Sequence, residues 1–492
     1  MLTPLDSLLR DKDFIALIRL LYRLKQATEQ CKNYIRRGAK PTKSYWCFYM
    51  NTINYIIDSL LILYSLYYLS FVLLGLIDRK VVGEEKTEGV EAKNKFAVVI
   101  PAHNEERVIS ELLMNLGELN YPSSLYDVFV VADNCRDSTA KVAGRHDVTV
   151  MERTNQDKTG KGYALKYGFR RIGLMEGSSD YDAVVVFDAD NLVEENFLRE
   201  MNSRLENGER IIQAYVDSKN PVDNWVTATF SMMFWINDRY TLLSRYNVGL
   251  SAVLMGTGMC ISSETLRSTG WDTNTLTEDL EYSIQALFRG VKTTFTKGTK
   301  VYDEKPVSFL ASCKQRLRWA RGQLSVLVQY VPRLLYRSFR EKNPVQLDAG
   351  LRLFQMPFIM FYFFITLLRW TMPGLFTGPI FNYVMSNVEI FGVVLPLMPF
   401  IIPSSLFLRD RLPGSAFKYV LLFPVFMYSW IAILYWALFT LDNDQWLHTS
   451  HFRSLSREDL IANDLITIVN TQSVGETRAK NLAAPRPMKT PM

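Results

Sequence analysis

Closely spaced carboxylates are the first feature of this sequence that could do chemistry. Asp188 and Asp190 form an Asp-x-Asp pair, and Glu278 and Asp279 are adjacent. Two carboxylates one residue apart can share a divalent cation, and their oxygen ligands suit Mg²⁺ or Mn²⁺. Such a cation can hold a diphosphate and neutralise the charge that builds on a leaving nucleoside diphosphate. An aspartate pair after a strand is often only part of a loop, so this pair alone leaves both interpretations open.

A second candidate site combines amide, cationic and aromatic side chains. Residues 315–323 read Gln-Arg-Leu-Arg-Trp-Ala-Arg-Gly-Gln. Arginine suits a diphosphate because its planar guanidinium presents a fork of donors. The indole of Trp319 offers an apolar face on which a sugar ring can stack. Taken alone, the same residues are equally typical of any basic amphipathic helix.

Short apolar runs predict the elements that must position these side chains. Four runs predict strands, over residues 96–100, 126–132, 147–151 and 182–187. Two intervening stretches, 105–117 and 161–174, predict helices. Strands that alternate with helices imply a parallel sheet, in which ligands bind at the carboxyl ends of the strands. Asp133 and Asp188 follow two of these runs directly, so we expect them to share one crevice.

Longer apolar runs flank this region and predict membrane spans. The 492-residue chain is 48% apolar and 22% charged, and the apolar residues are segregated. Residues 52–77 are long enough to cross a bilayer core of about 30 Å, with Asp58 as the lone charge. About three more spans are expected within 351–440. Their predicted ranges are 351–373, 385–408 and 417–440.

The remaining segments are assigned from charge and polarity. Residues 1–50 form a basic N-terminal segment, and residues 11–26 within it have the spacing of an interfacial amphipathic helix. Residues 325–345 predict a second helix at the membrane surface. Residues 441–492 form a C-terminal segment that is expected to be partly disordered. The net charge of +6 and the early basic run suit an anionic lipid surface or simply a solvated basic segment.

The orientation of these spans is ambiguous from the sequence. Arg409, Asp410 and Arg411 lie between the last two predicted spans and favour a cytoplasmic loop. A single early span before a cytosolic domain would place the basic N-terminal segment outside, against the positive-inside tendency. No signal peptide is expected. The five scattered cysteines form no Cys-x-x-Cys pair, and there are four histidines, so neither a disulfide framework nor a zinc site is expected.

Six motifs, in their order along the chain, resemble the inverting family-2 glycosyltransferases, which have a GT-A fold. They comprise Val99–Glu106, Val131–Thr139, Lys158–Leu165, Asp188–Asp190, and Thr277–Asp279 together with Gln315-x-x-Arg318-Trp319. The last pair narrows the resemblance to the membrane-embedded processive branch of cellulose, chitin, hyaluronan and poly-N-acetylglucosamine synthases. The similarity covers residues 95–325. It implies an α/β, Rossmann-like GT-A domain combined with an α-helical transmembrane domain.

The resemblance also implies a role for each matching residue. Asp190, with Asp188, would bind Mg²⁺ or Mn²⁺. The nucleotide-sugar would contact Ala102, His103, Glu105, Asp133, Lys161, Asp188, Gln315, Arg316 and Arg318. The acceptor would contact Met255, Gly256, Thr257, Glu278 and Trp319.

Asp279 would be the general base under this resemblance. An inverting transfer needs one carboxylate that removes the proton of the acceptor hydroxyl as its oxygen attacks the anomeric carbon. The alternative is structural, because Thr277–Asp279 could cap a helix over 280–288 by satisfying free amides. The two roles are compatible.

The resemblance implies an enzyme that polymerises a UDP-sugar and passes the β-linked product across the plasma membrane, with its catalytic domain in the cytoplasm. Asp279-Leu280 replaces the Asp-Arg pair that is common in chitin and hyaluronan synthases, which favours glucose or N-acetylglucosamine donors. A capsular or extracellular β-glucan made from UDP-glucose is the first choice, because no Phe-x-Val-Thr segment typical of cellulose synthase is present. A poly-N-acetylglucosamine-type synthase is second.

Two other classes of protein compete with this interpretation. A non-processive transferase acting on a lipid carrier would share the donor motifs, but would not need Gln-x-x-Arg-Trp with several later spans. A non-enzymatic scaffold would have damaged carboxylate motifs, whereas Asp133, Asp188, Asp190 and Asp279 are intact. The expected partners are a UDP-sugar, a growing polysaccharide and a lipid bilayer. No nucleic-acid partner is expected.

Overall fold

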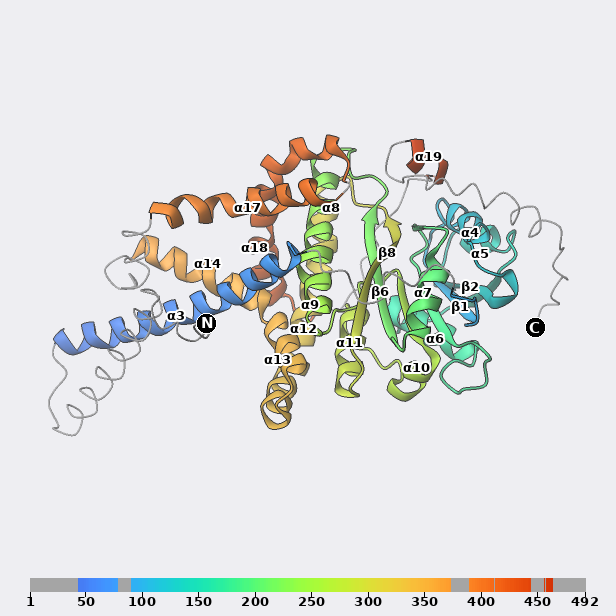
Figure 1. The fold of residues 1–492 in the computed structure, drawn as a ribbon, viewed down its shortest axis with the longest axis horizontal. Helices are drawn as coiled ribbons and strands as arrows, with labels where there is room; N and C mark the ends of the chain where they lie inside the picture. Colours follow the sequence, from blue (N-terminus) through green and yellow to red (C-terminus); the bar gives the residue numbers. More distant parts are fainter. Residues whose placement is uncertain are drawn as a thin grey trace, which may run out of the picture. The chain divides into compact units, whose positions relative to one another are not determined.

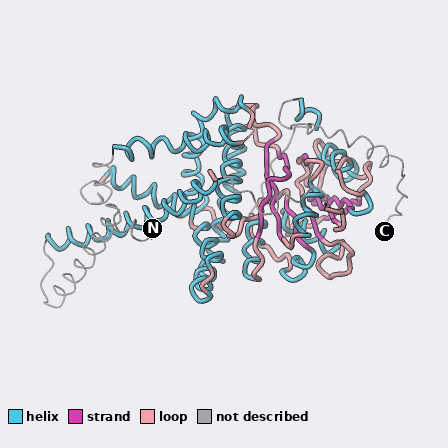
Figure 2. Tube along the Cα trace, in the orientation of Figure 1, coloured by secondary structure: helices cyan, strands magenta, loops and turns pink. Residues whose placement is uncertain are grey.

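The computed structural model describes residues 43–77, 90–372, 389–410, 412–443, 455 and 457–462, with the elements coloured in Figure 2. The amphipathic helix expected at 11–26 and most of the C-terminal segment 441–492 lie outside the described residues. The chain divides into two compact units. Unit 1 comprises Met1–Ser70 and Pro357–Met398, and unit 2 comprises Phe71–Met356 and Pro399–Met492.

Unit 2 contains an eight-stranded sheet with the order β3-β2-β1-β4-β7-β6-β8-β5 among the described residues. Its strands are β1 (Phe96–Ala102), β2 (Tyr126–Asp133), β3 (Thr149–Arg153), β4 (Ala183–Val186), β5 (Leu192–Val193), β6 (Ile211–Ser218), β7 (Met259–Ser262) and β8 (Thr293–Asp303). The prediction of a parallel sheet is correct for β1 to β4. It is wrong for the whole sheet, because β7 runs antiparallel to β4 and β6 and β5 runs antiparallel to β8.

Helices cover both faces of this sheet (Figure 1). Helices α4 (Ile109–Gly117), α5 (Thr139–Ala143) and α7 (Phe197–Glu206) pack with Phe96, Val98 and Ile100 on one face. Helices α6 (Lys161–Arg171), α10 (Ser263–Thr269) and α11 (Glu278–Phe288) pack with Ala97 and Val99 on the other. A strand buried on both faces has no polar face. This explains why the runs that predicted β1, β2 and β4 are continuously apolar.

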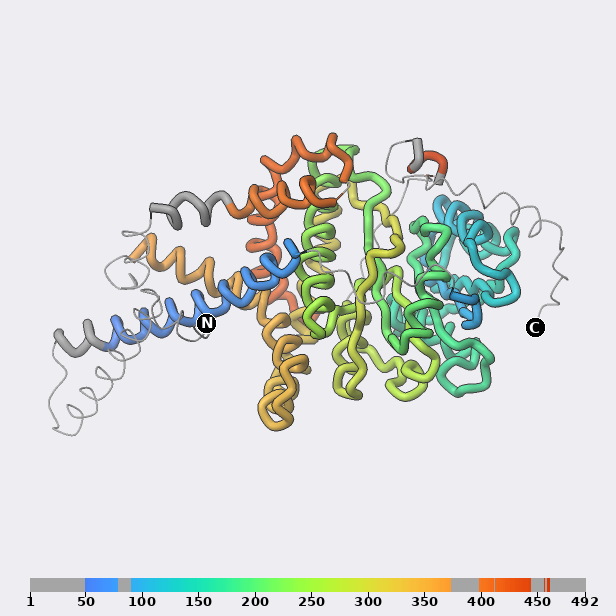
Figure 3. Tube along the Cα trace, in the orientation of Figure 1, coloured from blue at the N-terminus to red at the C-terminus, as the bar shows by residue number. Residues whose placement is uncertain are grey.

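The helical part of unit 2 packs against the sheet domain. It includes α8 (Trp225–Asn237), a π-helical turn at Asp238–Leu243, α9 (Ser244–Asn247), α12 (Phe309–Glu341), α13 (Pro344–Leu353), a 3-10 segment at Gly414–Leu422, and α18 (Phe423–Phe439). Phe426 of α18 packs with Phe230 and Phe234 of α8. Figure 3 shows this orange-red C-terminal segment beside the green α8.

The interface helix predicted over 325–345 is not a separate element. Residues 325–341 form the second half of α12, which also contains the predicted site residues 315–319. Lys342, with a left-handed φ of 50°, is the C-cap of α12, and Asn343 caps the following α13. One continuous helix therefore carries both the Gln-x-x-Arg-Trp motif and most of the predicted interface segment.

Two helices among the described residues are long and apolar enough to cross a membrane. The first is Tyr49–Gly75, which lies within α3 (Lys43–Gly75). The second is Gly414–Phe439, which consists of the 3-10 segment and α18. A bent pair, α13 with α14 (Gln355–Thr371), adds a third if it counts as one span. In α17 (Glu389–Arg409), Met398–Arg409 is a shorter apolar segment, and the span predicted at 385–408 begins outside the described residues. The sequence predicts four spans, whereas the described residues supply two or three.

Unit 1 contains an ion pair between two apolar helices. Asp58 of α3 accepts a hydrogen bond from Arg369 of α14, and both side chains are buried. The rings of Tyr64 and Phe358 pack 4.1 Å apart between the same helices. The lone charge that the sequence shows within the first apolar run is therefore neutralised by an arginine.

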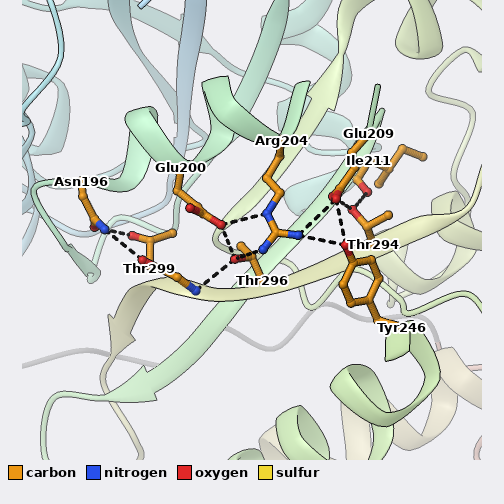
Figure 4. A network of polar contacts seen from close by, with 10 residues as sticks. Asn196, Glu200, Arg204, Glu209, Ile211, Tyr246, Thr294, Thr296 and Thr299 are labelled. Carbon is orange, nitrogen blue, oxygen red and sulfur yellow. Dashed lines mark hydrogen bonds and ion pairs between the residues drawn. The ribbon is translucent and has the colours of Figure 1, made fainter. Parts of the chain in front are cut away.

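A buried polar network joins α7 to β8 in unit 2 (Figure 4). Arg204 donates to Glu200 Oε1 at 2.9 Å and to Glu209 Oε1 at 3.1 Å, and its side chain is 2% exposed. Thr296 Oγ1 accepts from Arg204 at 3.0 Å and donates to Glu200. This network braces β8, the strand whose end reaches Asp190 through the amide of Glu304 (3.1 Å).

Candidate active site

The predicted nucleotide-binding residues lie at one edge of the sheet. Ala102 ends β1, Asp133 ends β2, and Asp188 follows β4 by two residues. Ala102 pairs with Ala132 and Val99 with Val186, so the three parallel strands end close together. The carboxyl ends of neighbouring parallel strands are where ligands bind in such sheets.

His103 is held in one orientation at this edge. Its Nδ1 lies 2.6 Å from the carbonyl oxygen of Asp133, which can only accept, so Nδ1 carries the hydrogen. Its Nε2 then accepts from Asn104 Nδ2 at 3.0 Å. Glu105 is buried at the start of this turn, and its amide donates to Thr139 Oγ1 at 2.8 Å.

Asp133 is joined to an arginine that sequence reasoning missed. Arg153, the last residue of β3, and Asn134 both donate to Asp133 Oδ1. Arg153 also donates to the carbonyl oxygen of Lys158 at 2.7 Å, which ties down the loop before α6. Burial raises the pKa of Asp133, and the Arg153 charge opposes that rise. The only signal for Arg153 in the sequence is a basic residue at the end of an apolar run.

The Asp-x-Asp pair forms a turn that is fixed by hydrogen bonds. The amide of Asp188 donates to Asn191 Oδ1 (3.0 Å) and to Thr257 Oγ1 (3.3 Å). Asp190 is buried, and its Oδ2 accepts from the amide of Glu304. Among the described residues no group of three or more His, Cys, Asp or Glu side chains could hold a metal ion. A cation held by one or two carboxylates together with substrate phosphates and waters fits this donor set.

A third carboxylate and a lysine lie near the Asp-x-Asp turn. Asp303 ends β8, and burial raises its pKa to about 6; Lys305 opposes this rise, and Asp190 adds to it. Lys219 donates to the carbonyl oxygen of Asp190 at 2.8 Å. Asp303 ends β8 and Lys219 directly follows β6, two strands that the sequence did not predict, so no local motif indicated these residues.

Glu278 and Asp279 begin helix α11. Thr277 occupies the N-cap position but makes no side-chain capping bond, while Asp279 Oδ1 accepts from the amide of Leu280 at 2.8 Å. Of the residues that could satisfy free amides at the start of this helix, Asp279 accepts from such an amide and Thr277 does not. Burial and the charge of Asp279 raise the pKa of Glu278 to about 7, against the opposing charge of Lys161. Burial also raises the pKa of Asp279.

Lys161 links these carboxylates to the Asp-x-Asp turn. Its Nζ donates to Asp188 Oδ1 at 2.5 Å and to the carbonyl oxygen of Gly256 at 2.9 Å. A Cβ atom at Gly256 would lie 3.4 Å from both Lys161 Nζ and Asp279 Oδ2, and the φ of Gly256 is 86°. Burial would lower the pKa of Lys161, but Asp188, Glu278 and Asp279 together raise it.

The loop 255–257 is fixed from below by Gln213, a fully buried residue that sequence reasoning missed. Gln213 accepts from the amide of Met255 at 2.7 Å and donates to the carbonyl oxygen of Thr257 at 2.8 Å. The hydroxyl of Thr257 bonds to Asn191, next to Asp190. The predicted acceptor loop and the predicted metal-binding turn are thus one hydrogen-bonded structure.

Gln315, Arg318 and Trp319 share one face of α12, because they are spaced at i, i+3 and i+4. The Arg318 charge lowers the pKa of both Glu278 and Asp279. Gln315 Oε1 and Arg318 Nε are buried and have no hydrogen-bond partner within the described part of the chain. The ring of Trp319 lies 5.7 Å from that of Phe230 on α8.

Arg316 is placed differently from the other predicted site residues of α12. Two residues along a helix turn about 200° around its axis, so Arg316 lies on a different face from Arg318. Its guanidinium is fully buried, donates to Ser429 Oγ at 2.7 Å and lies 4.1 Å from the Phe426 ring of α18. Its described contacts join α12 to α18.

Comparison with known proteins identifies the class of this domain. Residues 93–322 match the family model described as "Glycosyltransferase like family 2". This part of the chain is a glycosyltransferase family 2 domain, and its mixed sheet with carboxylates at the strand ends is a GT-A fold. The predictions of the fold class and of a glycosyltransferase enzyme are therefore confirmed.

The similar proteins differ in what their names say they act on. A probable glycosyltransferase, YdaM of Bacillus subtilis, is 28% identical over 57% of this chain and 64% of its own length. The beta-monoglucosyldiacylglycerol synthase of Trichormus variabilis is 28% identical over 48% of this chain and 50% of its own length. The solved mannosyltransferase PcManGT of Pyrobaculum calidifontis, in complex with GDP-Man and Mn²⁺, is 15% identical and has a TM-score of 0.49. That comparison covers 81% of this chain and all of PcManGT. The chain thus spans about half to two-thirds of the length of these curated relatives.

Proposed function

We propose that this chain catalyses inverting transfer of a sugar from a nucleoside diphosphate to an acceptor hydroxyl at a membrane. One observation carries the proposal. Lys161 joins Asp188, at the donor end of the site, to Gly256, in the acceptor loop, and Asp279 Oδ2 lies at the same glycine. A general base, a donor turn and an acceptor loop thereby converge on one point, as a single in-line displacement requires.

In this mechanism Asp279 accepts the proton of the acceptor hydroxyl. The hydroxyl oxygen forms a bond to the anomeric carbon as the bond from that carbon to the diphosphate breaks. Attack opposite the leaving group converts an α-linked donor into a β-linked product. Lys161 and Arg318 hold positive charge beside the carboxylates and the diphosphate position. Asp190 and Asp188 would hold Mg²⁺ or Mn²⁺, which neutralises charge on the leaving diphosphate when bound.

We take the acceptor to be the end of a growing β-linked polysaccharide and the donor to be UDP-glucose. The stripe of Gln315, Arg318 and Trp319 on α12 supports this proposal. It combines side chains that can donate hydrogen bonds to a diphosphate with an indole on which a sugar ring can stack. Helices with the length and composition of membrane spans would place the site at a bilayer, as export of the product requires. Glucomannan 4-beta-mannosyltransferase 7 of Arabidopsis thaliana, 24% identical over 47% of this chain, is a relative named for a polymer.

A lipid acceptor is the second candidate. It is favoured by the relatives named beta-monoglucosyldiacylglycerol synthase. Such an enzyme would transfer one sugar to a lipid hydroxyl that reaches the site from the bilayer. The catalytic domain would face the cytoplasm in both cases.

Product analysis separates the two candidates. Purified full-length protein in lipid nanodiscs would be offered UDP-glucose, UDP-N-acetylglucosamine, UDP-galactose, UDP-glucuronate or GDP-mannose singly, with Mn²⁺ or Mg²⁺, with and without diacylglycerol. Sustained UDP release with a high-molecular-weight product supports polymerisation. One sugar added to diacylglycerol establishes the second candidate. No transfer from any donor, despite nucleotide binding, would overturn both.

We expect the transfer rate to fall toward acidic pH, starting at a higher pH than a free aspartate would give. The base Asp279 must be deprotonated, and burial raises its pKa. A raised pKa keeps the carboxylate active above that pKa and protonates it below, so the loss of rate begins earlier on acidification than for an exposed carboxyl. The decline should approach about tenfold per pH unit for one titrating group. Initial rates at saturating donor between pH 5 and 9 test this, and a flat profile down to pH 5 would contradict it.

We expect Arg153→Met to weaken UDP binding by about tenfold or more, because a buried charge-assisted hydrogen bond to Asp133 is lost. The turnover number at saturating donor should change far less, since Arg153 lies away from Asp279. Calorimetric titration of UDP measures the first effect. Arg136→Met is the control, because Arg136 is exposed on the neighbouring loop. Equal UDP affinity in the two variants would remove Arg153 from the nucleotide site.

A further inference from the structure

Gly322 extends the face of α12 that carries the predicted acceptor and diphosphate residues. Gln315, Arg318, Trp319 and Gly322 follow the spacing i, i+3, i+4 and i+7, so they form one stripe along the helix. Gly322 is buried, and a helix interior is a poor place for glycine unless something else requires it. The position therefore calls for a packing reason.

The packing constraint at Gly322 is its contact with Thr277, in the segment that carries the proposed general base Asp279. A Cβ atom at position 322 would lie 2.6 Å from Thr277 Cγ2, 2.7 Å from Thr277 Oγ1 and 2.8 Å from the Thr277 backbone nitrogen. All three distances are shorter than real Cβ contacts, and the backbone atom cannot rotate away as a side chain could. The backbone of α12 thus packs directly on the residue before Glu278 and Asp279.

The same segment also meets a second glycine. A Cβ atom at Gly162, next to Lys161, would lie 3.2 Å from Glu278 Cβ and 3.1 Å from Thr273 Oγ1. The segment Thr277–Glu278 therefore packs against both the first turn of α6, which carries Lys161, and α12, which carries Arg318. Both cations act on Glu278 and Asp279 across these contacts.

We propose that Gly322 is a positioning residue, which sets the distance between the acceptor helix α12 and the general base. It does so because only a hydrogen side chain lets α12 reach Thr277. Gly322, Arg318 and Trp319 belong to one helix, so any larger residue at position 322 moves Arg318 and Trp319 away from Asp279 together. The inference rests on the transferase function proposed above, and it adds a residue that touches neither donor nor acceptor.

The test compares Gly322→Ala and Gly322→Val with Gly117→Ala in the full-length protein in nanodiscs. Gly117 is also a helical glycine, but a Cβ atom there would meet nothing within 4 Å. Alanine is intrinsically better than glycine in a helix, so a loss at position 322 cannot come from helix propensity. We expect Gly322→Ala to lower the turnover number by about tenfold or more and Gly322→Val to lower it further. UDP affinity should fall less than the turnover number, because Asp133 and its partners lie on other elements and only the α12 contacts to the diphosphate are displaced.

The pH profile separates positioning from general damage. Moving Arg318 away removes a charge that lowers the pKa of Glu278 and Asp279, so the acidic limb should shift to higher pH in Gly322→Ala. Lys161 stays in place on α6 and continues to oppose the rise. Turnover within about twofold of wild type, or a loss that parallels lost UDP binding with an unshifted profile, would overturn the proposal.

Hydrogen exchange provides a readout that needs no activity. The amide of Glu281 donates to the carbonyl oxygen of Thr277 at 3.0 Å, so displacement of Thr277 should speed exchange at Glu281. We expect this in Gly322→Ala and not in Gly117→Ala. If wild type transfers no sugar, the proposed function fails while the exchange result still tests the contact. Unchanged exchange in Gly322→Ala would overturn the contact itself.

Discussion

Asp279→Asn should abolish sugar transfer and leave nucleotide binding nearly intact. The substitution keeps the shape of the side chain, and the amide oxygen can still accept from the amide of Leu280. It removes the group that takes the proton, and general base catalysis contributes on the order of 10²–10⁴-fold in rate. We therefore expect the turnover number to fall roughly 10³-fold, with UDP affinity within about twofold of wild type.

Asp272→Asn is the matched control for this result. Asp272 lies on the loop that leads to Thr277, and its carboxylate pairs with Lys166 at the exposed surface. The same chemical change there should leave the turnover number unaltered. Product formation and calorimetric UDP titration measure the two effects for both variants. A rate loss in Asp279→Asn that comes entirely from lost UDP binding would refute the base role.

Arg204→Met should destabilise unit 2 more than any surface substitution. The guanidinium joins Glu200, Glu209 and Thr296 in a network that is almost wholly buried. Removal of one partner leaves buried carboxylates without their counter-charge, which costs about 3–5 kcal/mol. For a domain of this size we expect the midpoint of thermal unfolding to fall by roughly 6 to 20 °C.

Arg210→Met makes the same chemical change six residues away. Arg210 pairs with Glu264 at 3.4 Å, and both side chains are more than half exposed. Exposed pairs contribute about 0–1 kcal/mol, so the midpoint should hardly move. Thermal unfolding of both variants, followed by circular dichroism in nanodiscs, compares them. Equal shifts would mean that the network of Figure 4 stabilises the fold no better than a surface pair.

The elements that could be predicted are those whose own residues carry a continuous pattern, such as an uninterrupted apolar run. The apolar runs that predict β1, β2 and β4 are buried on both faces of the sheet, and their ends carry Asp133 and Asp188 as expected. Two of the strands that were missed lack such a signal. β5 has two residues, and β8 carries Lys297 and Lys300 within its span. Their pairing is set by contacts far along the chain, which a local pattern cannot encode.

The same distinction separates the site residues. Motif residues such as Lys161 and Asp279 converge because each follows or begins a predictable element. Arg316 shows where adjacency misleads, since its side chain leaves the helix toward α18 although Arg318 is two residues away. Arg153 and Gln213 were missed because each supports a motif residue through a long-range hydrogen bond. Supporting residues of this kind become visible only when the fold brings them together.

The ion pair inside unit 1 constrains how the chain can be made. Asp58 and Arg369 are 311 residues apart, and a ribosome adds roughly 5–20 residues per second. An α3 helix that enters a bilayer early waits roughly 15 to 60 seconds before Arg369 exists. An unpaired carboxylate within an inserted helix costs up to about 2.5–3.5 kcal/mol during that interval. If α3 spans a bilayer, its insertion must therefore wait for α14, or Asp58 must be shielded until Arg369 reaches it.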